Sequence, residues 1–126
     1  ALLLCTVFMI TLTSCGGKPD GMSKAMHQIG KNALNIADQY ISGEIYGDVA
    51  YERMEELYTQ AKAQEEKECK DLGVDTLVGT DYWKDSSVSH DISMLSHSVM
   101  NAKHGSGAMS EVQEARDNLA ETLGEK

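Results

Sequence analysis

Proline is almost missing from this sequence. Pro19 is the only one, and the 107 residues that follow it contain none. Those residues are rich in Ala, Glu, Lys, Met, Leu and Gln, which favour helices, and they show almost none of the alternation typical of strands. The sequence therefore predicts an all-α fold, a small antiparallel bundle of three to four helices.

Basic residues are also scarce. The chain has 11 Lys and Arg against 20 Asp and Glu, for a net charge of −9, and residues 1–14 carry none of these charges. An acidic surface is repelled by nucleic-acid phosphates and by anionic lipid head groups. We therefore exclude nucleic acid as a partner, and we expect any membrane association to depend on something other than a basic face.

Enzyme motifs are absent as well. The sequence contains no H-E-x-x-H, no G-x-S-x-G, no G-x-x-x-x-G-K and no C-x-x-C-H. No Glu precedes a His by three residues, as the di-iron carboxylate bundles require. We expect a protein that is not an enzyme and holds no cofactor.

The first twelve residues, ALLLCTVFMITL, form an apolar run without charge. At about a dozen residues the run is too short to cross ~30 Å of hydrocarbon as a helix. It is typical of the apolar part of a secretory signal. Because it begins at Ala1 without Met or a basic stretch, we expect the start of that signal to be truncated.

The run ends in Leu12-Thr13-Ser14-Cys15, which resembles the lipobox of bacterial lipoproteins. The resemblance implies that Cys15 receives a diacylglyceryl group and that residues 1–14 are removed as a signal peptide. Acyl chains, palmitate among them, would then hold the protein on the cell membrane or the outer membrane, outside the cytoplasm. Gly16, in place of Asp, implies sorting outward where an outer membrane exists. The alternative is an ordinary secretory signal with a chance cysteine.

On this interpretation the mature chain cannot form an internal disulfide. Cys5 leaves with the signal and Cys15 is lipidated, so Cys69 is alone. It is either a buried small side chain or a thiol that links two copies. Residues 15–21 form a flexible tether that spans at most about 25 Å, and residues 22–126 form the helical domain.

Apolar residues at helical spacing predict four helices, at about 22–41, 48–72, 86–104 and 111–123. Asp48 and Asp85 are expected N-caps, and Ser110 opens a capping-box pattern. Gly30 lies at the edge of its apolar stripe, where it permits close approach by a neighbour. The fourth stripe is narrow, so we expect the last helix to be the least stable.

The second half of helix 48–72 loses its apolar stripe, because Glu65 and Glu68 fall on it. We interpret these residues and Cys69 as the polar face of a helix that projects past the core, rather than as a cation site. The connection 73–84 carries Tyr82 and Trp83. One interpretation is that the apolar residues of this connection cover the open end of the bundle. The other is that the aromatic pair lines a ligand-binding surface.

His90, His97 and His104 recur every seven residues on helix 86–104, on the face opposite its apolar stripe. Successive imidazoles lie about 10.5 Å apart along the axis. One metal ion cannot bind two of them, because Zn–N bonds are ~2 Å long. A soft site that includes Met94 would need ligands from another helix or another copy. The simpler interpretation is a solvated polar face.

The sequence therefore predicts a lipid-anchored, extracytoplasmic bacterial lipoprotein that binds or scaffolds another, unknown protein. The alternative function is binding of a metal ion or a small ligand by the His and Met face of the third helix.

Overall fold

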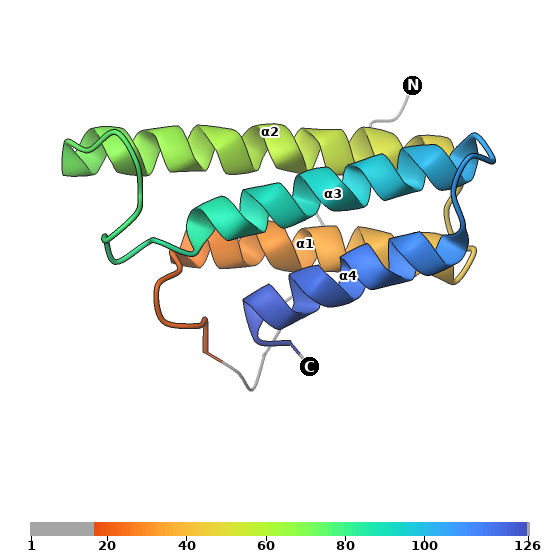
Figure 1. Ribbon diagram of the computed structural model, residues 1–126, viewed down its shortest axis with the longest axis horizontal. Coiled ribbons are helices and arrows are strands. Elements are labelled where there is room, and N and C mark those ends of the chain that lie inside the picture. The colour runs from red at the N-terminus through yellow and green to blue at the C-terminus, as the bar shows by residue number, and fades with distance from the viewer. Residues whose placement is uncertain (1–16, 126) are drawn as a thin grey trace, which may run out of the picture.

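The computed structural model describes residues 17–125, so the signal and the lipobox lie outside the described residues. The described chain folds into four helices that run alternately up and down (Figure 1). They are α1 (Lys24–Ile41), α2 (Gly47–Leu72), α3 (Asp85–Lys103) and α4 (Met109–Leu123). The prediction of an all-α antiparallel bundle is confirmed.

Neighbouring residues determine where some helices begin and end, but these are not always the residues expected as caps. Ser23 caps α1 by accepting a hydrogen bond from the Met26 N–H at 3.1 Å. Gly73 ends α2 in the left-handed region at φ 68°, where glycine has no Cβ penalty. The predicted Asp48, Asp85 and Ser110 caps are wrong.

Each predicted cap lies inside its helix instead. The N-cap residues of α2, α3 and α4 are Tyr46, Lys84 and Ala108, and none of them makes a side-chain capping bond. In α3 the reason is a competing partner, because the Asp85 carboxylate binds Ser23 across the bundle.

The core runs along the axis between all four helices. α1 packs against each of the other three, while α2 and α4 lie at opposite corners without packing on each other. The fully covered apolar side chains include Met26, Met54, Ile92, Leu95, Val112 and Leu119. The fourth helix is thus a full member of the bundle, with Val112, Leu119 and Leu123 buried.

Gly30 shows why α4 can lie so close to α1. A Cβ built on Gly30 would come within 2.5 Å of a Leu123 methyl and 3.2 Å of a Val88 methyl. A side chain at this position would force the Leu123 methyl groups to shift. The predicted close approach at Gly30 is therefore confirmed.

Polar side chains also tie the helices together. Arg116 on α4 donates two hydrogen bonds to Asp38 on α1, at 2.8 and 3.2 Å. The Thr122 hydroxyl on α4 donates to Asp91 on α3 at 2.6 Å. The Arg116–Asp38 pair adds little to the stability of the fold, because exposed ion pairs contribute only about 0–1 kcal/mol.

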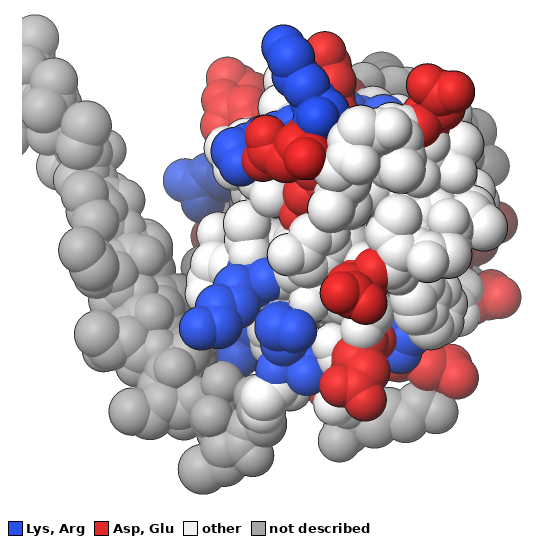
Figure 2. Space-filling model, turned by 90° about the vertical axis from the view of Figure 1, so that its left-hand side faces the viewer, with Lys and Arg blue, Asp and Glu red and all other residues white. Residues whose placement is uncertain are grey.

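The two ends of the bundle differ. Seen from the end where α2 connects to α3, the surface has an uncharged area bordered by charged side chains (Figure 2). The chain also enters α1 at this end (Figure 1). Within the described residues, no helix has both the length and the apolar composition that a membrane span requires.

Candidate functional site

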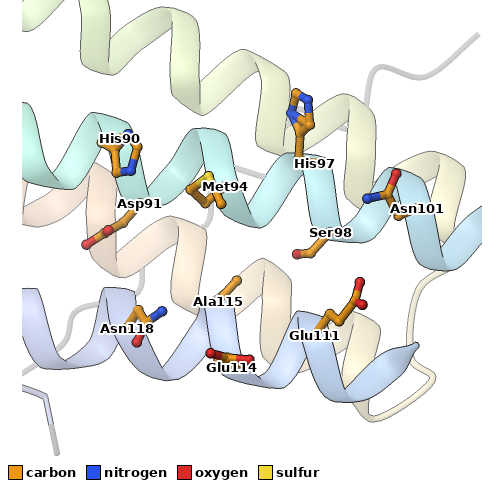
Figure 3. Close-up of a pocket in the computed structure, with 10 residues that line it drawn as sticks. All are labelled: His90, Asp91, Met94, His97, Ser98, Asn101, Glu111, Glu114, Ala115 and Asn118. Atoms are coloured by element: carbon orange, nitrogen blue, oxygen red, sulfur yellow. The ribbon is translucent and has the colours of Figure 1, made fainter. Parts of the chain in front are cut away.

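A groove of about 450 Å³ lies between α3 and α4 (Figure 3). The α3 side contributes His90, Asp91, Met94, His97, Ser98 and Asn101, and the α4 side contributes Glu111, Glu114, Ala115 and Asn118. Two of the three predicted histidines therefore belong to it, together with Met94. His104, the C-cap residue of α3, is not among its lining residues.

Met94 is the most prominent apolar group of this groove. Its side chain is 53% exposed, although methionine is usually a core residue. Ala115 points from α4 toward the side of α3 that carries Met94 (Figure 3). The groove therefore offers a flexible thioether and a methyl group, bordered by polar side chains, to a partner that has some apolar surface.

The charges in the groove have one sign. Asp91, Glu111 and Glu114 line it, and none of its lining residues is Lys or Arg. Sequence reasoning missed the two glutamates because their relation to α3 depends on how α4 packs. A cationic ligand is therefore favoured over an anionic one.

The histidines do not form a metal site with these carboxylates. Across residues 17–125, no three His, Cys, Asp or Glu side chains gather closely enough to hold a metal ion. The His97 imidazole points away from α4, so it does not face Glu111 or Glu114 (Figure 3). A metal bound by these histidines would still need ligands from a second copy of the chain.

The aromatic candidates lie elsewhere, at the end where α2 connects to α3. Trp83 is 53% exposed, and Tyr82 is half-buried. The indole lies against the backbone of Gly21, where a Cβ would come within 2.4 Å of Trp83 Nε1. The Lys84 ammonium lies 5.3 Å from the centre of the Trp83 ring. Leu77 is buried, whereas Val78 is 84% exposed.

A pair of buried carboxyl groups, Glu68 on α2 and Asp85 on α3, lies at this same end. Asp85 is fully buried, and Ser23 donates to it twice, from its N–H at 3.0 Å and from its hydroxyl at 2.7 Å. Glu68 is 4% exposed, and its Oε1 accepts a hydrogen bond from Gln64 at 2.7 Å. The interpretation of Glu68 as part of the polar face of a helix that projects past the core is therefore wrong, because Glu68 is buried.

The two carboxyl groups are electrostatically linked. Burial, followed by a hydrogen bond with the Glu68 carboxyl, raises the pKa of Asp85 to about 7, although the Ser23 bonds act in the opposite direction. Glu68 Oε2 is buried without a hydrogen-bond donor from the described chain. A proton shared between Asp85 and Glu68 would satisfy this oxygen, because two ionised carboxylates repel each other at such close range.

Ser89 and Glu65 extend this cluster of buried carboxyl groups. The Ser89 hydroxyl donates to Glu65 Oε1, and also lies 3.1 Å from the Asp85 carbonyl oxygen. Glu65 in turn accepts from the Lys62 ammonium at 2.6 Å. Cys69 is half-buried and has no disulfide partner among the described residues. The cluster connects α1, α2 and α3 and is structural in character.

Comparison with known proteins gives no further guide. No protein-family model, curated protein or solved structure matches this chain.

Proposed function

We propose that this protein is a non-enzymatic, lipid-anchored bacterial lipoprotein that holds a partner protein close to the outer face of a membrane. The anchor is Cys15, on the strength of the lipobox-like Leu12-Thr13-Ser14-Cys15. The localisation is extracytoplasmic, on the cell membrane or the outer membrane. The observation that carries the interaction role is the acidic groove between α3 and α4.

The shape and charge of the groove favour a particular kind of partner. Its volume of about 450 Å³ lies in the ordinary range for binding sites. The Met94 thioether is adaptable and apolar, and the groove is also lined by three carboxylates and by no Lys or Arg. These features suit a peptide segment that has basic side chains beside one or two apolar ones.

Site-specific photo-crosslinking in the native envelope tests the groove. A photoreactive residue in place of Met94 should give a discrete adduct with one partner. The matched control replaces Glu52, an exposed residue of α2, which does not pack on α4. Glu111→Lys with Glu114→Lys should abolish the Met94 adduct and leave the helical circular dichroism unchanged. Equal adducts from both positions would contradict a groove-specific role.

The anchor is tested separately. Cys15→Ala should remove the acyl mass from the protein and release it from the membrane, or stall its processing. A variant that still partitions into detergent like the wild type would show that the lipobox interpretation is wrong.

The alternative function, metal binding by the α3 histidines, makes a different prediction. Since His90 and His97 lie about two helical turns apart, a metal must recruit a second copy of the chain. Stoichiometric Zn²⁺ or Cu²⁺ would then dimerise the protein in analytical ultracentrifugation, and His90→Gln with His97→Gln would abolish the dimer. A monomer with and without metal would leave the protein-binding role as the better account.

A further inference from the structure

The end of the bundle where α2 connects to α3 exposes an unusual number of apolar side chains. Four of them form what we call the apolar end: Leu72, Val74, Val78 and Trp83, with exposed fractions of 47, 37, 84 and 53%. All four lie on the last turn of α2 or on the connection to α3. Single exposed apolar residues are ordinary, but a group of this size at one end of a small domain indicates a binding surface.

The chain that leads to Cys15 is fastened to this same end. The Gly21 carbonyl oxygen accepts a hydrogen bond from the Lys84 N–H at 2.8 Å, and the Trp83 indole lies on the Gly21 backbone. Six residue steps separate Gly21 from Cys15, a reach of at most about 21 Å. A lipid anchor on Cys15 would therefore keep Trp83 near the bilayer, whatever path the tether takes.

The charge at this end differs from that of the rest of the protein. The accessible charges of segments 17–24 and 67–84 are five lysines and four aspartates: Lys18, Lys24, Lys67, Lys70 and Lys84, with Asp20, Asp71, Asp75 and Asp81. The whole chain has 11 basic and 20 acidic residues. Acidic and basic side chains are therefore nearly balanced in these segments, so the repulsion expected between an acidic protein and anionic lipid is weaker at this end.

We propose that the apolar end is seated on the surface of the phospholipid bilayer, with Trp83 and Val78 among the lipid head groups. This inference rests on acylation of Cys15, which belongs to the proposed function. Trp is well suited to this depth because its ring is amphipathic, and the Lys84 ammonium beside it can reach lipid phosphates. The acyl chains supply the affinity, and the apolar end fixes the orientation.

Trp83 is the only tryptophan of the chain, so its fluorescence reports on the apolar end alone. The experiment places the acylated full-length protein in phosphatidylcholine vesicles whose acyl chains are brominated near the glycerol, which quenches tryptophan at the interface. Trp83 emission should shift to the blue and lose intensity several-fold relative to unbrominated vesicles. Val78→Asp, at an 84% exposed position, should reduce the quenching without changing the acyl mass.

A matched variant moves the probe to the opposite end. Trp83→Phe with Tyr46→Trp places the tryptophan at an 84% exposed position before α2. The 18 residues of α1 separate the two ends by about 27 Å. This variant should show no quenching by brominated lipid.

The outcomes separate the two proposals. Acyl mass on Cys15 together with quenching of Trp83 alone supports both. Acyl mass with an unquenched Trp83, or with equal quenching at both ends, overturns the seating and leaves the anchor intact. Protein without acyl mass overturns the anchor, and the seating falls with it.

Discussion

Replacing Asp85 by Asn should make the stability of this protein less sensitive to pH. The asparagine is a neutral mimic of the protonated acid. Its carbonyl oxygen can accept from the Ser23 N–H, which lies 3.0 Å from the wild-type Oδ1. Its amide can donate to the buried Glu68 Oε2, which has no donor from the described chain. The variant therefore keeps the bond from the Ser23 N–H and removes the titration, but its amide nitrogen cannot accept the bond that the Ser23 hydroxyl donates to the wild-type Oδ2.

The sign follows from the two pKa values of Asp85. In the unfolded chain the group ionises near 3.8, and in the native protein its pKa is raised to about 7. Between these pH values the native state binds more protons than the unfolded state, so the free energy of unfolding falls as pH rises. Stability from this group is fully present below about pH 4 and is lost by about pH 7.

The magnitude is large for a small domain. One pKa unit corresponds to about 1.4 kcal/mol, so a rise from 3.8 to about 7 amounts to roughly 4 kcal/mol. A domain of this size has only about 5–15 kcal/mol in total. Between pH 4 and pH 8 the stability of Asp85→Asn should rise by about 2–4 kcal/mol relative to the wild type. The variant should start slightly less stable at pH 4, because it lacks the bond from the Ser23 hydroxyl.

Urea unfolding followed by helical circular dichroism at several pH values between 4 and 8 measures this difference. Asp75→Asn is the matched control, because it removes the same charge from an exposed position. It should follow the wild-type pH profile. Parallel profiles for the wild type and Asp85→Asn would show that the buried carboxyl pair does not share a proton.

Four further substitutions test the packing and one ion pair. Gly30→Ala should destabilise by roughly 1–3 kcal/mol in urea unfolding, because its methyl overlaps the Leu123 side chain and outweighs the gain of about 1 kcal/mol in helix propensity. Leu95→Ala should cost about 2–5 kcal/mol because Leu95 is fully buried, and partly buried Ile36→Ala should cost less; equal melting temperatures would contradict this difference. Arg116→Ala should cost under about 1 kcal/mol, since its ion pair is largely solvated; a larger loss would mean that α4 depends on it.

The fold could be predicted because its signals are local. Helical spacing of apolar residues placed all four helices, and the glycine that ends α2 needed no tertiary information. The predicted Asp85 cap failed for the opposite reason. Asp85 has a good capping side chain, but its carboxylate is taken by Ser23, which is 62 residues away in sequence. A tertiary partner of this kind cannot be read from propensity.

One feature of the sequence could have indicated the buried carboxyl pair. Glu68 follows Ala61 by seven residues, so the two lie on one face of α2, and Ala61 is fully buried. A carboxylate on an apolar stripe indicates either that the stripe has ended or that the acid is buried with a partner. The choice depends on what packs against it, here the first turn of α3. The groove could not be predicted for the same reason, because Glu111 and Glu114 come from α4 and their position depends on how α4 packs against α3.

The apolar end and the groove together constrain how this protein would work. With the apolar end on the bilayer, the helices stand away from the membrane, and the groove lies between α3 and α4 (Figure 3). A helix of 15 residues such as α4 is about 22 Å long. A partner segment in the groove would therefore lie within a few tens of ångströms of the lipid. Since the acidic groove and anionic lipid both attract basic segments, the protein would compete with the membrane for such a segment and hold it away from the lipid surface.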